Sequence, residues 1–401
     1  MAVTGGDGRQ RAATAIPLPL LLAVITVLPP RNASSQAVPR TDTPRAGHLR
    51  VTFEPVITTW DRQFTSDGHE QRIGNSLFAE TRPPFLCSTV GGVVVCRYNF
   101  TPVFVREERR VTPLALDFSI TNRIAVGVYA PIVRVNTRAG YQLDSVGSVG
   151  APEAAARLDT ILSDTTYGFG PIRGTSRRRR FFAGDVEVHA KYRVIESRTY
   201  AMSGAVVVRL PTGHQDSPNH LFDLSTGDHQ TDIELQMAHE LTLFDRLWLN
   251  ALVRAGRQQP GTRARRVGPQ SVLLIPHAAL APLNWDPGDY LAVDIAPMFR
   301  VGKDFGVGFT AGYWTQTRDR YTYRAAQDSI DLATRLGAPV SAAVLDAGTA
   351  FRWTRLGVAL TYTTSDLEGS LSVEQTVSGS GGLVPVASVF RIVMRTSRWP
   401  F

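Results

Sequence analysis

The chain has 401 residues and a formal net charge of +8, with 43% hydrophobic and 19% charged residues. It contains 34 glycines and 25 prolines but lacks long stretches of helical period, so a chain built mainly from strands is predicted. A positive net charge suits nucleic acid. The basic residues are scattered apart from one run at 177–180, which argues against a nucleic-acid partner.

Residues 1–37 have the pattern of a cleaved secretory signal peptide. A basic start precedes an apolar stretch of roughly a dozen residues, and the small residues Ser35 and Ala37 precede the expected cleavage point. Nothing after residue 38 approaches the ~18 continuous apolar residues of a spanning helix. We therefore expect an exported chain that does not meet nucleic acid and that enters a membrane, if at all, through strands.

Period-two alternation is the strongest signal in the remainder of the chain. In TDIELQMAHEL, residues 231–241, Ile, Leu and Met alternate with Asp, Glu and Gln. GDVEVHAKYRV, residues 184–194, repeats the scheme with Val, Ala and Tyr against five charged or ionisable residues. Such alternation predicts strands with one apolar and one polar face, as in half-buried sheets and membrane barrels.

About twelve such segments are long enough to cross a bilayer at a tilt of ~45°. They are predicted at 48–60, 107–121, 123–136, 184–196, 199–211, 230–243, 246–257, 288–301, 305–318, 344–354, 355–364 and 384–401. Short turns alternate with loops of roughly 18 to 50 residues, an asymmetry typical of outer-membrane barrels. We therefore predict an all-β fold, a transmembrane antiparallel up-and-down barrel over 48–401, with short periplasmic turns and long extracellular loops. A short periplasmic segment, 38–47, would precede it, and both termini would be periplasmic.

The chain ends in Trp399, Pro400 and Phe401 rather than in a polar tail. Aromatic residues at the end of a last strand fit the girdle at the periplasmic rim of a barrel. That strand would also close the barrel and remove its free edge. Its alternation is irregular, which a bulge near Pro400 would explain.

Three segments and the terminal Phe401 carry a family resemblance. The segments are GDVEVHAKYRV, VVVRLPTG (206–213) followed by STGDHQTDIEL (225–235), and LGVALTYTTSD (356–366). They resemble the outer-membrane proteins of the phenol-degradation MetA pathway, which are distantly similar to FadL-type transporters of hydrophobic compounds. FadL-type channels carry an N-terminal plug of several tens of residues, far longer than the segment predicted here before the first strand.

The resemblance implies a channel in the outer membrane of a Gram-negative bacterium, for passive uptake or efflux of small, hydrophobic or aromatic organic molecules. Outer-membrane lipid, lipopolysaccharide and a small-molecule solute are the implied partners. The terminal residues Trp399 and Phe401 would form part of the signal that the barrel-assembly machinery recognises.

The polar residues on the predicted inner faces are candidates for lining a lumen. They are Asp185, Glu187, His189, Lys191, Arg193, Arg209, Asp232, Glu234, Gln236, Glu240, Arg254, Asp294 and Arg300. Both charge signs are present. One interpretation is a polar pore with a transverse field that orients solutes, and the other is a ladder of salt bridges that fills a narrow barrel. A barrel of ~12 strands is wider than the eight-stranded barrels that side chains fill and narrower than the sixteen-stranded barrels that hold an open channel. Its width therefore does not decide between the two interpretations.

Cys87 and Cys96 flank a predicted two-residue turn at Gly91 and Gly92. Pairing across this turn places the cysteines opposite each other as a non-hydrogen-bonded pair, with Cα atoms about 4.5 Å apart. This separation is within disulfide range, and an exported protein permits the bond. We predict a disulfide that staples the first external loop.

A basic run lies in TSRRRRFF, residues 175–182, which falls in the second external loop or at the mouth of a strand. It consists of Arg177, Arg178, Arg179 and Arg180. Four guanidinium groups fit the phosphates of lipopolysaccharide through bidentate hydrogen bonds. The alternative is a solvated run of charge.

No enzymatic pattern is found, so we expect a protein without catalytic activity or cofactor. The twelve-stranded outer-membrane phospholipases use a His-x-Ser pattern, and none of the 8 histidines has Ser two residues later. One external loop gathers His214, Asp216, His220, Asp223, Asp228 and His229. These residues would suit a divalent cation or simply a polar loop, and we expect no metal site.

Two functions remain open at this stage. The first is a passive channel for small organic molecules. The second is a structural or surface-interaction barrel with a side-chain-filled lumen, whose long loops are the functional part.

Overall fold

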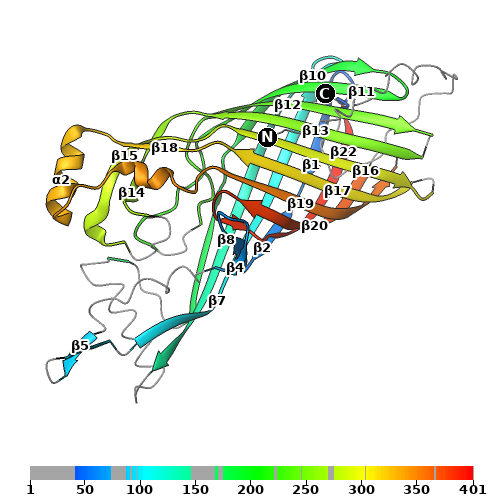
Figure 1. Ribbon diagram of the computed structural model, residues 1–401. Helices are drawn as coiled ribbons and strands as arrows, with labels where there is room; N and C mark the ends of the chain where they lie inside the picture. Colours follow the sequence, from blue (N-terminus) through cyan, green and yellow to red (C-terminus); the bar gives the residue numbers. More distant parts are fainter. Residues whose placement is uncertain are drawn as a thin grey trace, which may run out of the picture. The chain divides into compact units, whose positions relative to one another are not determined.

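The computed structural model describes residues 41–73, 87–90, 93–96, 98–145, 168–169, 175–220, 224–244, 246–269, 275–302, 304–364 and 367–400. Over these ranges the chain is mostly β, with a closed antiparallel barrel of 12 strands (Figure 1). The barrel strands are β1 (His48–Phe53) continued by β2 (Val56–Trp60), β7 (Tyr98–Ser119), β8 (Ile124–Ser145), β10 (Glu187–Glu196), β11 (Tyr200–Arg209), β12 (Asp232–Leu243), β13 (Leu247–Gln258), β16 (Tyr290–Arg300), β17 (Phe305–Gln316), β19 (Phe351–Thr363), β20 (Leu367–Ser380) and β22 (Ser388–Pro400).

The barrel closes through its first and last strands. β1 and β2 act as one barrel strand that is interrupted at residues 54–55, and both halves pair with β7 on one side and β22 on the other. The amide of Ile392 donates to the carbonyl of Pro55 at 3.0 Å, so β22 remains bonded across the interruption. Every other barrel strand pairs with its neighbours in chain order.

The two ends of the barrel differ in their connections. Tight turns join β7 to β8, β10 to β11, β12 to β13, β16 to β17 and β19 to β20. We call this the short-turn end, and the opposite end, where the remaining connections lie, the long-loop end. The turn after β10 shows how tight these connections are, because the amide of Ser197 donates to the carbonyl of Tyr200 at 2.8 Å.

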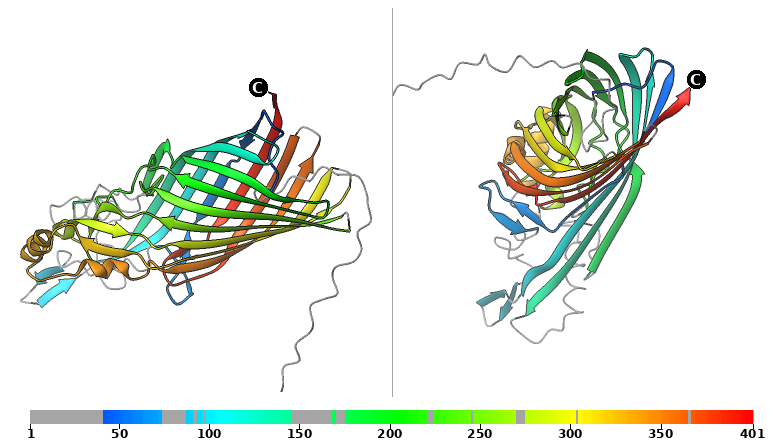
Figure 2. Two further views of the ribbon diagram at one scale, coloured as in Figure 1. Left: turned by 90° about the horizontal axis from the view of Figure 1, so that it is seen from above. Right: turned by 90° about the vertical axis from the view of Figure 1, so that its right-hand side faces the viewer.

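Further elements lie in the connections at the long-loop end. They are β3 (Arg62–Phe64), β4 (Glu70–Arg72), β5 (Cys87–Val90), β6 (Val93–Cys96), β9 (Thr175–Ala183), β14 (Gly261–Arg266), η3 (His277–Ala279), β15 (Leu280–Asp286), β18 (Arg320–Tyr323), α2 (Ala326–Leu336), η4 (Ala342–Asp346) and β21 (Val384–Pro385). The part of β8 that continues past its pairing with β10 pairs instead with β9, and with β7 these strands form the long ribbon seen in Figure 2.

Strands β14, β15 and β18 form a separate small sheet with its own apolar core. Leu283 of β15 and Leu332 of α2 are fully buried there, together with Trp285. The helix α2 ends at Gly337, whose φ of 73° is the left-handed conformation that glycine adopts without strain. Among the residues that the structure describes, no helix is both long and apolar enough to cross a membrane.

The barrel strands up to β17 overlap the predicted segments, although β7 begins at residue 98 rather than 107 and β8 ends at residue 145 rather than 136; the order of strands was mispredicted only near the C-terminus. The segments predicted at 344–354 and 355–364 are not two strands, because residues 342–346 form η4 and β19 runs unbroken through the supposed turn at 354–355. The pairing with β20 shifts register there, because Val377 of β20 is an extra residue opposite Thr354 and Arg355. The strand that was missed is β20, whose Ser- and Gly-rich sequence resembles a loop. The sequence analysis predicted one strand that does not exist, at 344–354, and missed one that does, β20. The predicted number of barrel strands is therefore still correct.

Cysteine labelling tests the orientation of the barrel in the membrane. In a Cys87→Ser, Cys96→Ser background, a membrane-impermeant maleimide added to intact bacteria should label Ala326→Cys, at the start of α2. It should label Thr199→Cys, in the turn after β10, only once the outer membrane is permeabilised, because short turns face the periplasm in such barrels. Labelling of Thr199→Cys on intact cells would reverse the orientation.

Candidate functional site

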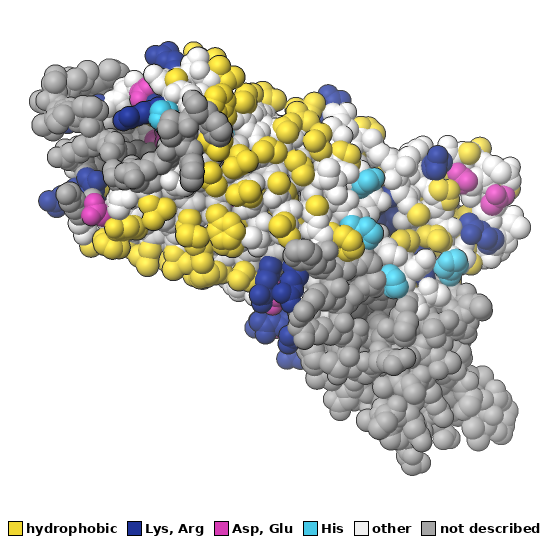
Figure 3. All heavy atoms as spheres, turned by 180° about the vertical axis from the view of Figure 1, so that it is seen from behind, with side chains coloured by type: hydrophobic (Ala, Val, Ile, Leu, Met, Phe, Trp, Pro, Cys, Tyr) yellow, Lys and Arg dark blue, Asp and Glu magenta, His cyan; other side chains and the backbone are white. Residues whose placement is uncertain are grey.

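The barrel has an apolar outer face. The exposed side chains of β10 and β12 include Val188, Leu235 and Met237, and Leu235 is 57% exposed. Figure 3 shows hydrophobic side chains spread over one side of the molecule. Soluble proteins rarely expose apolar patches of this extent, whereas lipid covers them on a membrane barrel. The outer face is therefore suited to contact with lipid.

The polar residues predicted to line a lumen lie on the opposite, inner face. Glu187, His189, Lys191 and Arg193 alternate with exposed residues on β10, and Asp232, Glu234, Gln236 and Glu240 lie on the inner side of β12. Cross-strand pairing puts Arg209 of β11, Arg254 of β13, and Asp294 and Arg300 of β16 on the same side. Asp185 precedes β10 at the long-loop end.

Ion pairs between neighbouring strands neutralise these charges. Arg209 donates to Glu187 at 3.0 Å and to Asp232 at 2.9 Å. On the next strands along, Arg254 donates to Asp294 at 2.8 Å. The Asp232 side chain is only 1% exposed, and a buried carboxylate needs such a partner to offset its loss of hydration.

Similar pairs continue on strands where the sequence did not predict them. His189 lies 2.6 Å from Asp117 of β7, and Arg355 of β19 donates to Glu374 of β20 at 3.2 Å. Arg300 lies over the ring of Trp248, with 5.0 Å between its Cζ atom and the ring centroid. Ion pairs and a cation–π contact therefore join strands along the inner wall.

Residues 41–46 contact the inner wall between the short-turn end and the middle of the barrel. The amide of Thr41, which is fully buried, donates to Glu240 at 2.8 Å. The ammonium group of Lys191 donates to the carbonyl of Asp42 at 2.9 Å, and Arg50 pairs with the Asp42 carboxylate at 2.7 Å. Two predicted lumen residues, Lys191 and Glu240, therefore bind residues 41–42 of the same chain.

Asp185 fastens a loop at the long-loop end. Its carboxylate accepts hydrogen bonds from the amides of Gly213 at 2.7 Å and of Asp228 at 3.0 Å. Burial, followed by the nearby charge of Asp185, raises the pKa of the Asp228 carboxyl group. Asp185 thus acts on the loop that follows β11 as well as lying near the lumen.

The acidic and histidine residues of that loop are dispersed. Asp216 pairs with Arg263 at 2.8 Å and with Arg265 at 3.3 Å, and His214 stacks on Phe182 with 5.1 Å between ring centroids. Over the described residues, which do not include Asp223, no three metal-ligating side chains are grouped together.

The other predicted sites are placed only through their backbone. Cys87 lies opposite Cys96 in the β5–β6 pair, which confirms the predicted register, and the disulfide itself stays a prediction. The run Arg177, Arg178, Arg179 and Arg180 belongs to β9, and Trp399 lies opposite Leu49. The side chains of these residues, and the whole of Phe401, are outside the described part of the structure.

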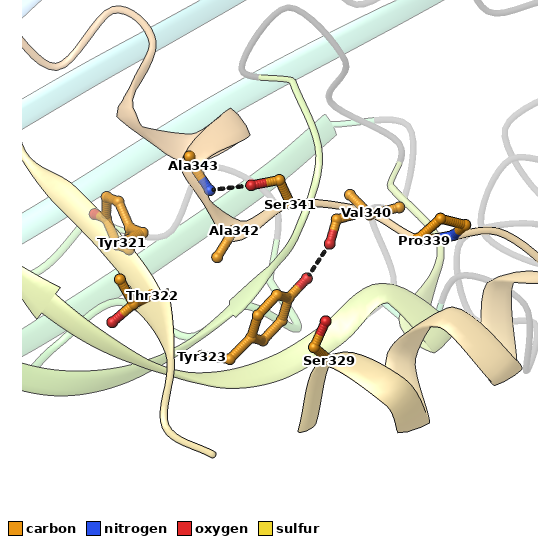
Figure 4. A pocket seen from close by; sticks show the side chains of 9 residues that line it. All are labelled: Tyr321, Thr322, Tyr323, Ser329, Pro339, Val340, Ser341, Ala342 and Ala343. Atoms are coloured by element: carbon orange, nitrogen blue, oxygen red, sulfur yellow. Dashed lines mark hydrogen bonds between the residues drawn. The ribbon is translucent and has the colours of Figure 1, made fainter. Parts of the chain in front are cut away.

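A hollow of about 600 Å³ lies in the small sheet at the long-loop end (Figure 4). Residues 321–323 of β18 form one part of its lining, and Ser329 of α2 and the segment 339–343 form the remainder. The Tyr323 hydroxyl donates to the carbonyl of Val340 at 2.6 Å, which ties the two parts together. This hollow is separate from the inner wall of the barrel.

The sequence matches no family model and no curated protein. Among solved structures, an outer-membrane channel from Pseudomonas putida F1 matches 90% of this chain and 100% of its own, with 10% identity and a TM-score of 0.52. The two chains share a fold. A FadL homologue from Pseudomonas aeruginosa and a toluene transporter from Ralstonia pickettii are also similar at 10% identity, with TM-scores of 0.33 and 0.35. They match 87% and 88% of this chain, and 89% and 90% of their own.

Adjacent residues of β12 test the assignment of the two faces. Met237→Arg places a charge against lipid, which costs roughly 2–4 kcal/mol near the bilayer midplane, so the folded fraction should fall. Gln236→Arg, one residue away on the inner face, retains a hydrogen-bond donor toward Glu234 and should fold almost normally. Heat-modifiable migration during a urea titration measures both. Equal losses would contradict the assignment.

Proposed function

We propose that the protein is an outer-membrane channel for passive uptake or efflux of small, hydrophobic or aromatic organic molecules. The observation that carries this proposal is a closed barrel with an apolar outer face and a polar inner wall whose charges are paired. The fold shared with an outer-membrane channel supports it. The outer membrane of a Gram-negative bacterium, with periplasmic termini, is part of the proposal.

The paired wall bears on the kind of solute. When opposite charges lie about 3 Å apart, their fields largely cancel a few ångströms away. Pairs such as Arg209 with Glu187 and Arg254 with Asp294 therefore give an inorganic ion little net attraction to offset its loss of water. A small organic molecule, which holds water less strongly, loses less on entry. The wall thus favours organic solutes over inorganic ions.

The other proposed partners are lipid, lipopolysaccharide and the barrel-assembly machinery. We propose that outer-membrane lipid covers the apolar face, and that Arg177, Arg178, Arg179 and Arg180 bind lipopolysaccharide phosphates. Trp399 and Phe401 would be recognised by the barrel-assembly machinery. A Cys87–Cys96 disulfide would hold the β5–β6 hairpin.

A structural or surface-interaction barrel is the second candidate function. The observation that favours it is the occupation of the inner wall by salt bridges and by residues 41–46. Such a barrel would pass nothing, and the long-loop end, with its small sheet and hollow, would be its functional part.

Planar-bilayer recording separates the two candidates. The channel predicts measurable conductance with weak ion selectivity. Asp294→Asn leaves Arg254 without its partner and should shift the reversal potential toward anions, whereas Arg254→Gln should shift it toward cations, because pore charges act at short range. Asp331→Asn, on α2 outside the barrel, is the matched control and should change nothing.

Silent bilayers with folded wild-type protein would contradict the channel and favour the structural barrel. Conductance with a reversal potential unchanged by both substitutions would remove the Arg254–Asp294 pair from the conducting path.

A further inference from the structure

Three aromatic side chains form a continuous row on the inner wall at the long-loop end. They are Tyr290 of β16, Trp314 of β17 and Trp353 of β19, which come from consecutive strands. The rings of Tyr290 and Trp314 stack with centroids 4.2 Å apart and planes 16° apart. Those of Trp314 and Trp353 are 6.2 Å apart and nearly parallel, at 3°. We call these three residues the aromatic row.

Neighbouring residues hold the aromatic row in place. Tyr290 lies opposite Gly256 of β13, where its ring leaves no room for a Cβ atom, and its hydroxyl donates to Glu234. At the other end, the Cζ atom of Arg355 lies 4.5 Å from the centroid of Trp353. The row is therefore anchored at both ends before any solute arrives.

The row is accompanied by hydrogen-bond donors that lack an acceptor. Within the described residues, the indole N–H of Trp314 and the Nε–H groups of Arg254 and Arg355 are buried without a partner. The nearby carboxylates of Asp294 and Glu374 already accept hydrogen bonds from these arginines through other nitrogens. Unpaired buried donors cost free energy that an added acceptor recovers.

Two of these donors belong to the row or touch it, since one is the indole of Trp314 and Arg355 lies over the Trp353 ring. A Cβ atom placed at Gly312 would lie 3.0 Å from a carboxylate oxygen of Asp294 and 3.7 Å from the Trp353 ring, so the partner of Arg254 lies in the same part of the wall as that ring. Arg355 lies over the same ring and pairs with Glu374. Aromatic rings and spare N–H donors therefore occur in the same part of the wall.

We infer that the aromatic row is a binding site for a planar aromatic solute that carries an oxygen acceptor, such as a carboxylate or a phenolic oxygen. The ring of the solute stacks on the row, and its oxygen accepts from the spare N–H groups after a small side-chain rotation. Aromatic pairs gain energy from ring geometry beyond their buried area, which an aliphatic solute of equal size does not. The inference rests on the proposed channel and names a binding site for its solute.

Benzoate is the probe, with cyclohexanecarboxylate as a control of equal charge and similar size without a π system. Isothermal titration of the full-length protein in detergent should show saturable binding of benzoate and weaker binding of the control. Trp353→Leu should weaken benzoate binding about tenfold. The substitution removes a stacking surface and also the ring over which the Arg355 guanidinium lies.

A second variant separates hydrogen bonding from stacking. Trp314→Phe keeps a ring but removes the indole N–H, and it should weaken benzoate severalfold. Trp248→Phe makes the same change away from the row, beneath Arg300, and should leave the affinity unchanged. Heat-modifiable migration confirms that each variant is folded, and Trp314→Phe alone decides the matter if Trp353→Leu does not fold.

The outcomes distinguish the site from the channel. Equal affinity for benzoate and cyclohexanecarboxylate, or benzoate affinity unaffected in the folded row variants, overturns the inference. Conductance without benzoate binding at millimolar concentration also overturns it and leaves the channel standing. Row-dependent benzoate binding in a protein that conducts nothing supports the site and overturns the channel.

Discussion

Backbone hydrogen bonding is the constraint on which the rest of this structure depends. A sheet surrounded by lipid has no water to satisfy a free edge, so it must close on itself. Here closure depends on the most irregular strand, in which β1 and β2 are separated at residues 54–55 and the register shifts between Leu49 and Val51. Because both halves pair on both sides, the irregularity leaves no open edge.

Closure also determines what the inner wall must contain. Once lipid requires apolar side chains at alternate positions, the intervening residues point into a confined space where each charge needs a partner. Arginine meets this need with a planar group that bonds two acceptors, as Arg209 does with Glu187 and Asp232. The aromatic row arises from the same alternation, since Tyr290 shares its face with Asp294 on β16.

The alternation of apolar and polar residues was sufficient to predict those strands in which it is unbroken. The bounds of β10 and β12 were predicted to within three residues, because each strand keeps a strict period of two. β20 was not, since Ser and Gly replace many of its apolar residues and its own alternation shifts at Val377, opposite Thr354 and Arg355 of β19. α2 lies in a loop that the alternation of barrel strands does not describe.

Side-chain contacts between neighbouring strands could not be predicted from the sequence, for a different reason. A pair such as Arg355 with Glu374 depends on the register between two strands, and one of them had not been recognised. The row of Tyr290, Trp314 and Trp353 likewise becomes visible only when three strands are aligned. By contrast, the register of Cys87 and Cys96 follows from one short turn, so it was predictable.

The contacts of residues 41–46 with the inner wall have a consequence for the order in which the protein folds. Thr41 bonds Glu240, which is 199 positions away, and Lys191 bonds Asp42 across 149 positions. Contacts so distant in sequence carry a large loop-closure cost and form late, after the local hairpins. Residues 41–46 make these contacts only once β10 and β12 have taken their places in the barrel wall. Burial of these residues is therefore a late step of folding. The Thr41 amide becomes protected from hydrogen exchange only when the surrounding barrel wall has formed.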